Sequence, residues 1–121
     1  MIRSPALIAA AFGALAVMLG AFGAHALGTR LDAASLQTWH TAVDYQFWHA
    51  LALLGLASAP VSRWRLAASI AFCAGILLFC GSLYALALGA PRWIGAVTPV
   101  GGLALIAGWA CLGCAFWRTA R

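Results

Sequence analysis

Residues 5–27 read PALIAAAFGALAVMLGAFGAHAL, and no Asp, Glu, Lys or Arg interrupts this run. A helix of this length measures roughly 35 Å, enough to cross a ~30 Å hydrocarbon core with slight tilt. Arg3 precedes the run, and Ala24-His25-Ala26 has the small-x-small form of a signal-peptide cleavage site. Because the run is longer than the apolar region of a signal peptide, we expect an uncleaved transmembrane helix.

The composition of the whole chain agrees with a membrane location. Hydrophobic residues make up 65% of the 121 residues and charged residues only 7%, whereas soluble domains carry about 25% charged residues. A helix surrounded by lipid can be apolar on every side, which a soluble helix cannot. The sequence therefore predicts an all-α integral membrane protein that forms one domain over residues 1–121.

Three further apolar stretches follow the first and complete four expected transmembrane spans, at about 5–27, 42–59, 64–89 and 95–117. Asp32 is the expected N-cap of the second helix. The polar first turns of that helix, residues 33–41, are expected in the outer interface with Trp39 as an interfacial anchor. The connections between spans are short, which favours antiparallel neighbours and predicts a four-helix antiparallel bundle.

The arginines predict how the helices are oriented. Arg30 and Arg92 fall on one side with Asp32, and the other side carries Arg3, Arg63, Arg65, Arg118 and Arg121. The positive-inside rule then places both termini in the cytoplasm, with the inner (plasma) membrane as the location if the protein is bacterial. These positions also account for the net charge of +5, so we expect no nucleic-acid partner.

Small residues recur at spacings that let helix backbones approach closely, which is how helices associate in lipid. The expected packing positions are Gly13, Ala16, Gly20, Gly23, Ala24, Gly28, Gly75, Gly81, Ala85 and Gly89. Four thin helices offer more of this surface than they can use among themselves. We therefore expect a homo-oligomer or a place in a larger membrane complex, with membrane lipids as the other partners.

Polar side chains gather in residues 39–49, WHTAVDYQFWH, and polar groups inside a membrane are functional candidates by default. With a span of 42–59, His49 lies near the middle of the bilayer and Asp44 about 7.5 Å nearer the outer face. The expected site is a polar pocket that opens outward and binds a lipid headgroup or relays protons. Its members are His25, Asp44, Tyr45, Gln46, His49 and Tyr84.

The same residues also have a purely structural interpretation. His40 with Asp44, and Tyr45 with His49, are separated by one helical turn and can pair, while Gln46 can hydrogen-bond another helix. A site in which His25, His40 and His49 bind one metal ion is disfavoured, because His40 and His49 lie on opposite sides of their helix and about 13.5 Å apart. A haem or two-ligand site on His25 and His49 remains an alternative, and we predict no metal or cofactor.

Catalytic motifs are missing from the sequence. Cys111-x-x-Cys114 lacks the βαβ context of a redox motif, and Cys73 and Cys80 are also expected to be packing residues. The chain contains no Glu and therefore no pair of glutamates for acid–base catalysis. We predict that the protein is not an enzyme.

Two motifs resemble a known family. They are Gly20-Ala-Phe-Gly-Ala-His25-Ala-Leu27 and, at the expected separation, Trp39-x-Thr-Ala-Val-x-Tyr45-Gln46-x-x-His49-Ala-Leu-Ala-Leu53. They are similar to the small membrane proteins of the domain of unknown function 423 family, which includes YgdD/YwdK-like and transmembrane protein 256-like proteins. The resemblance implies a four-helix membrane protein without an established biochemical role. It points to Gly23, His25, Tyr45, Gln46 and His49 as the recurring positions.

Taken together, these features predict a small, self-associating membrane protein that acts as a lipid-binding or accessory subunit of a membrane complex. The rival classes are a small oligomeric transporter or proton-linked channel, and a haem or quinone redox protein. Asp44 is the one carboxylate available inside a span for the transporter class.

Overall fold

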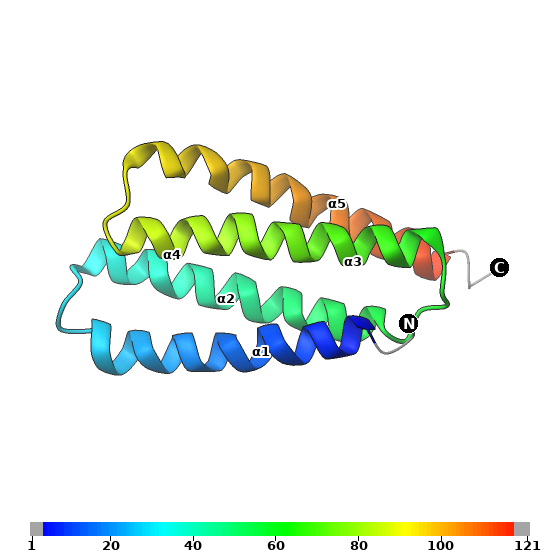
Figure 1. Cartoon of the computed structure of the whole chain (residues 1–121), viewed down its shortest axis with the longest axis horizontal. Helices are drawn as coiled ribbons and strands as arrows, with labels where there is room; N and C mark the ends of the chain where they lie inside the picture. The colour runs from blue at the N-terminus through cyan, green and yellow to red at the C-terminus, as the bar shows by residue number, and fades with distance from the viewer. Residues whose placement is uncertain (1–3, 118–121) are drawn as a thin grey trace.

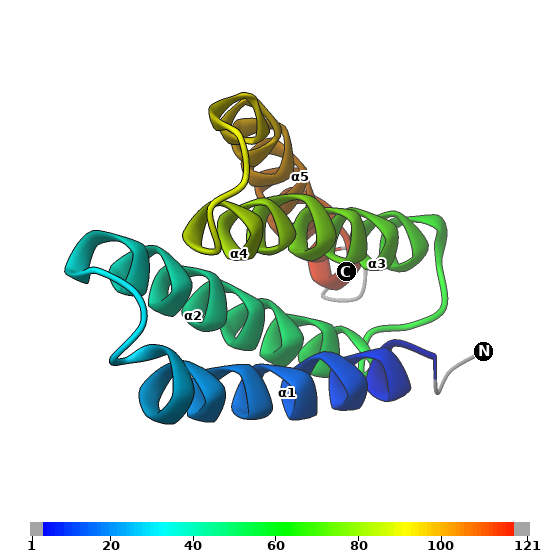
Figure 2. The same cartoon turned by 60° about the vertical axis from the view of Figure 1, so that its left-hand side comes forward.

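The structure is a computed structural model that describes residues 4–117. Among these residues the regular structure is helical throughout, and strands are absent, which confirms the predicted all-α class. The chain forms two helix pairs. In one pair α1 (Ser4–Phe22), extended by the π-helical turn η1 (Gly23–Leu27), lies along α2 (Ala33–Leu56). Figure 1 and Figure 2 both show this pair beneath the second one.

The second pair consists of one long helical run and a final helix. The run comprises α3 (Arg63–Gly75), the π-helical segment η2 (Ile76–Cys80) and α4 (Gly81–Ala87). A 3-10 turn, η3 (Arg92–Ala96), then leads into α5 (Val97–Trp117), which packs along α3 and η2. Because α2 also packs against α4 and η2, it is the helix that joins the two pairs.

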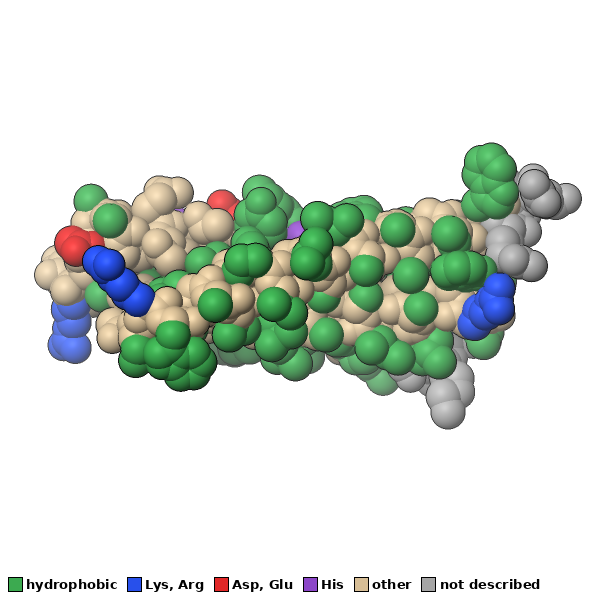
Figure 3. Space-filling model, turned by 90° about the horizontal axis from the view of Figure 1, so that it is seen from above, with side chains coloured by type: hydrophobic (Ala, Val, Ile, Leu, Met, Phe, Trp, Pro, Cys, Tyr) green, Lys and Arg blue, Asp and Glu red, His purple; other side chains and the backbone are tan. Residues whose placement is uncertain are grey.

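Three helical runs are long and apolar enough to cross a membrane, namely Pro5–Leu27, Arg63–Ala87 and Arg92–Trp117. The α2 helix is as long as they are but is not among them, because it carries the polar stretch of residues 39–49. Figure 3 shows one face of the molecule on which basic side chains lie towards the two ends and hydrophobic side chains dominate between them. This distribution matches a protein embedded in lipid. A fourth span stays a prediction.

Residues at the ends of the helices explain where the helices start and stop. Asp32 accepts a 2.7 Å hydrogen bond from the Ser35 backbone N–H, which confirms its predicted role as the N-cap of α2. This bond holds the pKa of the exposed Asp32 carboxyl below its ordinary value. At the end of α4, Gly89 has φ +99°, a left-handed conformation that favours glycine, and the Ala90 N–H bonds the Ala85 carbonyl at 2.9 Å. These are features of a Schellman C-cap.

The α2 helix ends at Leu56, earlier than the expected end of the second span at residue 59. It is continuous from Ala33, so residues 33–41 form the start of this helix, and their place in the outer interface stays a prediction. Trp39, the expected interfacial anchor, is only 3% exposed and donates a 2.9 Å hydrogen bond from Nε1 to the Leu19 carbonyl of α1. The indole fits because Gly23 has no side chain: a Cβ there would lie 2.6 Å from the ring. The expectation of a lipid-facing Trp39 is therefore wrong.

Close packing occurs at some of the expected small residues. Ala16 is buried, Gly20 faces Val43, and Gly75 faces Leu105, whose Cγ would lie 2.7 Å from a Cβ at that glycine. Ala85 is partly buried, and Gly89 serves the C-cap. No atom of another helix lies within 4 Å of a Cβ placed at Gly13, Gly28 or Gly81, and Ala24 is exposed. The reason is geometric, since four residues turn a helix by about 400°, and a stripe with period four drifts off the contact face.

Two glycines of α5 were missing from the expected set. A Cβ at Gly101 would lie 2.7 Å from the Cα of Phe79 and closer still to its backbone nitrogen. A Cβ at Gly108 would lie 2.6 Å from the Phe72 ring. With Leu105 between them and Ala115 beyond, they follow a heptad spacing, which is the signal that identifies this buried stripe.

Candidate functional site

Gln46 lies at the centre of the expected polar pocket and connects three helices. Its side chain is 2% exposed. The Nε2 group donates a 2.9 Å hydrogen bond to the Phe12 carbonyl of α1, and Oε1 accepts a 2.8 Å bond from the Tyr84 hydroxyl of α4. Both ends of the amide are therefore used to join α2 to its neighbours, as expected for a polar side chain packed between helices in lipid.

His49, one turn beyond Tyr45 on α2, connects the helix to α5. Its ring is 5% exposed. Trp109 Nε1 lies 3.0 Å from His49 Nε2, and His49 Nδ1 lies 2.6 Å from the Tyr45 carbonyl. The indole N–H can only donate, so Nε2 must accept, and the proton must sit on Nδ1, where it is donated to the carbonyl. His49 is therefore a neutral imidazole with both nitrogens engaged.

This geometry predicts which tautomer a measurement will find. In protein labelled with ¹⁵N-histidine, we expect the His49 resonances of a protonated Nδ1 and an unprotonated Nε2. Trp109→Phe removes the donor while keeping a ring, so the proton should stay on Nδ1, where it is bonded to the Tyr45 carbonyl, and the Nε2 resonance should move to that of an acceptor without a donor. His25, which is exposed on η1, is the internal reference for an unconstrained ring. A proton found on Nε2 in the unaltered protein would contradict the arrangement.

Aromatic rings surround the two polar side chains. The Tyr45 ring stacks on His49 with centroids 5.9 Å apart and contacts Phe79 at 4.6 Å. Trp109 packs edge-on against both His49 and Phe72. These ring contacts fix the orientation of the imidazole.

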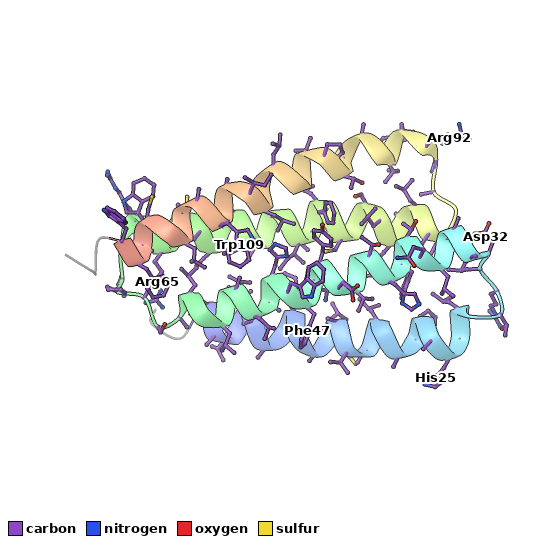
Figure 4. All side chains as sticks on the ribbon, turned by 180° about the vertical axis from the view of Figure 1, so that it is seen from behind. His25, Asp32, Phe47, Arg65, Arg92 and Trp109 are labelled. Carbon is purple, nitrogen blue, oxygen red and sulfur yellow. The ribbon has the colours of Figure 1, made fainter. Side chains whose placement is uncertain are left out.

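The structure brings together four of the six residues expected in the pocket, Tyr45, Gln46, His49 and Tyr84, and leaves out the other two. His25 is exposed, and Figure 4 shows it pointing away from the bundle. Asp44 is also exposed, on the outward side of α2. Of the two expected side-chain pairs, the structure gives no bond between His40 and Asp44 within residues 4–117, whereas Tyr45 and His49 do pair, through their stacked rings and the bond from His49 Nδ1 to the Tyr45 carbonyl.

The bonds between α1 and α2 also exclude a group held jointly by His25 and His49. Trp39 and Gln46 lie seven residues apart on α2. Their partners on α1, Leu19 and Phe12, also lie seven residues apart, in the opposite direction along the chain. By this register His49 lies level with Ala9, about 24 Å along α1 from His25. Across the described part of the chain, no three His, Cys, Asp or Glu side chains gather as a metal site.

Arg65 is a further buried polar residue, and its sequence position alone predicts only a charge at the end of the span. It is 4% exposed, and Nη1 donates a 3.1 Å hydrogen bond to the Ala59 carbonyl. The Ser62 hydroxyl caps the same helix by accepting from the Arg65 N–H at 3.2 Å. Arg65 therefore secures the connection between α2 and α3, at the opposite end of the bundle from Asp32 and Arg92 (Figure 4).

A large concavity lies outside this polar cluster. It is an apolar groove of about 780 Å³ between the start of α1 and the outer side of α3. Ile8 lines one wall, Leu66, Ile70 and Leu77 line the other, and Arg63 stands at one end. From Arg63 to Leu77 the groove follows α3 for roughly 21 Å, which is somewhat more than half of a ~30 Å hydrocarbon core. We refer to it as the α1–α3 groove.

Comparison with known proteins identifies the family. The model of the family described as "Protein of unknown function (DUF423)" matches residues 19–102. The UPF0382 inner membrane protein YgdD of Escherichia coli strain K12 is 44% identical over 109 residues, covering 88% of this chain and 83% of that protein. The UPF0382 membrane protein YwdK of Bacillus subtilis strain 168 is 42% identical over 105 residues, covering 78% and 80%. No solved structure matches significantly. The chain thus belongs to the DUF423 family of small membrane proteins, as the motifs at residues 20–27 and 39–53 predicted.

Proposed function

We propose that this protein is a non-enzymatic, multi-pass subunit of the inner membrane that binds lipid and associates with itself. In this proposal α2 is the fourth span of an antiparallel bundle, because its polar side chains bond α1, α4 and α5 rather than water. Arg63 and Arg65 lie at one end of the bundle, and Arg30 and Arg92 lie at the other end together with the acidic Asp32. In this proposal the positive-inside rule places the end with Arg63 and Arg65, and with it both termini, in the cytoplasm. Arg3, Arg118 and Arg121 lie outside the described residues.

The α1–α3 groove is the observation that supports lipid binding. Its lining is almost wholly apolar, and its length suits an acyl chain that reaches from the surface towards the middle of the bilayer. Arg63 lies at the end that would meet the cytoplasmic headgroups, where its exposed guanidinium can bind a phosphate. The cytoplasmic leaflet is also where anionic lipids attract basic side chains.

Native mass spectrometry tests this function directly. The protein is extracted mildly from membranes that contain phosphatidylethanolamine and phosphatidylglycerol, and the lipid it retains is counted. We expect bound phosphatidylglycerol, and about fivefold less of it in Arg63→Gln, because one arginine near an anionic surface contributes about 1 kcal/mol. Ala74→Phe, which fills the groove, should lower the retention of both lipids.

The matched control adds the same ring to an alanine outside the groove. Ala107→Phe lies on α5, away from the α1–α3 groove, and should retain lipid as the unaltered protein does. If Ala74→Phe and Ala107→Phe retained equal amounts of lipid, the lipid would not bind in the α1–α3 groove. A protein that carries no lipid after mild extraction would remove lipid binding altogether.

The transporter class is less well supported by the same geometry. A proton path needs groups that can gain and lose a proton in sequence. His49, the titratable ring at the centre of the bundle, has both nitrogens occupied by Trp109 and by the backbone of Tyr45. The amide of Gln46 is likewise engaged at both ends. These bonds favour a rigid, bonded core over a conducting one.

A further inference from the structure

Asp44 occupies an unusual depth along the bundle. The register set by the bonds from Trp39 to Leu19 and from Gln46 to Phe12 places Asp44 level with Ala14 of α1. Within the apolar run Pro5–Leu27, Ala14 lies nine residues from one end and thirteen from the other, or roughly 14 and 20 Å. By the same register His49 is level with Ala9, about 6 Å from the Pro5 end of that run, so Asp44 rather than His49 lies nearer the middle of the run. The carboxylate itself lies near the middle.

The Asp44 side chain points outward at this depth. It is exposed, and so are Trp48 and Leu51 further along the same face of α2. Thr41, one turn earlier, uses its hydroxyl to bond the Gln37 carbonyl at 3.0 Å, so it is turned back onto its own helix. Within residues 4–117 the structure gives Asp44 no hydrogen bond or ion pair.

A carboxylate that faces hydrocarbon is costly, and such groups in membrane proteins pair with a donor. The described arginines cannot serve, because Arg30, Arg63, Arg65 and Arg92 all lie at or beyond the ends of the helical runs. His40 is the nearest candidate on the same helix, one turn from Asp44 and partly exposed. The outward face of α2 therefore carries one acid and one donor, about 6 Å apart along the helix axis.

We propose that this face is the interface between two copies of the chain, related by a two-fold axis along the membrane normal. In that arrangement Asp44 of each copy accepts a hydrogen bond from His40 of the partner subunit, so that both acids are paired. Two-fold interfaces are self-complementary in this way. The proposal rests on the self-association in the proposed function and names the surface responsible.

The apolar part of the same face supports a second copy as the occupant. Trp48 and Leu51 extend the contact beyond the polar pair. Between α1 and α2 lies a second, smaller groove of about 180 Å³, lined by Ala10, Gly13 and Leu51 among others. Nothing lies within 4 Å of a Cβ placed at Gly13, so the groove is open to a side chain from a facing helix. Small residues beside a protruding aromatic ring are typical of helix contacts in membranes.

Co-isolation of two differently tagged copies tests the interface. Both copies are expressed in one cell, extracted mildly, and purified through the first tag, and the second tag is measured. We expect the unaltered copies to co-isolate, and Asp44→Leu or His40→Leu to lower the recovery about tenfold. The exchanged double variant His40→Asp/Asp44→His should recover most of the signal, since each copy again offers one acid and one donor.

Disulfide crosslinking in isolated membranes gives a second measurement that does not depend on extraction. Leu51→Cys should form a crosslinked dimer above the background of the unaltered chain. Leu103→Cys, on the lipid-facing side of α5 and 67% exposed, is the matched control and should not. Dimers that persist in Asp44→Leu, or tagged copies that fail to co-isolate, would overturn the proposal, as would recovery of a different membrane protein in place of the second copy. Phosphatidylglycerol retention should be unchanged in Asp44→Leu, which separates this outcome from failure of lipid binding.

Discussion

Replacement of Gly101 by alanine is expected to destabilise the protein by about 3 kcal/mol, because the new methyl group would overlap the backbone of Phe79. The Cα of Phe79 would lie 2.7 Å from the added Cβ, and the Leu78 carbonyl carbon 2.8 Å. Backbone atoms cannot swing aside as a side chain can, so α5 must move away from η2. Thermal unfolding in detergent, followed by circular dichroism, measures the loss.

Gly102, the next residue of α5, provides the control for Gly101. A Cβ there would meet only the Phe79 ring, at 3.7 Å, which is an ordinary contact. Gly102→Ala should therefore leave stability unchanged or raise it by up to about 1 kcal/mol through the better helix propensity of alanine. If the two variants unfold at the same temperature, the close approach of α5 to η2 is not as described.

Replacement of Gln46 by leucine is expected to cost about 2 kcal/mol. It removes the bond to the Phe12 carbonyl and leaves the Tyr84 hydroxyl without its acceptor. Single interhelical hydrogen bonds in membranes contribute on the order of 0.6 kcal/mol, and an orphaned buried donor adds a further cost of about 1–3 kcal/mol. Tyr84→Phe removes the hydroxyl with the bond and should cost less than Gln46→Leu, by the same unfolding measurement.

Gln37→Leu tests whether the effect belongs to the position or to the residue type. Gln37 lies on the same helix, and its side chain is exposed. The substitution removes the same amide without breaking a bond between helices, so its effect should be within about 0.5 kcal/mol. A loss as large as that of Gln46→Leu would mean that the three-helix connection through Gln46 contributes nothing of its own.

Much of the fold follows from local sequence. The apolar runs predict the helices because a residue's preference for lipid does not depend on its distant partners. Asp32 predicts the start of α2 because its partner, the Ser35 N–H, lies three residues away. The buried face of α5 is also predictable from its sequence, because small and apolar residues recur there with heptad spacing: Gly101, Leu105, Gly108 and Ala115.

The candidate site depended on contacts that lie far apart in the sequence. Trp39 is a typical interfacial residue, and it is buried here because Gly23 leaves room for its ring. His49 and Trp109 are separated by 60 residues, so neither local spacing nor residue type could pair them. The depth of Asp44 follows from the register between α1 and α2, which two long-range bonds determine.

The distribution of these bonds along the chain has a consequence for biosynthesis. A ribosome delivers α1 before α2, and the carbonyls that receive Trp39 and Gln46 already lie in α1. If α2 crosses the membrane as proposed, it can enter as one half of a hairpin with α1, with the side chains of Trp39 and Gln46 already bonded to α1. Tyr84 and Trp109 arrive only with the later helices. Order of synthesis and order of bonding thus coincide for α1 and α2, so that in the proposed arrangement two polar side chains of α2 have partners before the later helices are made.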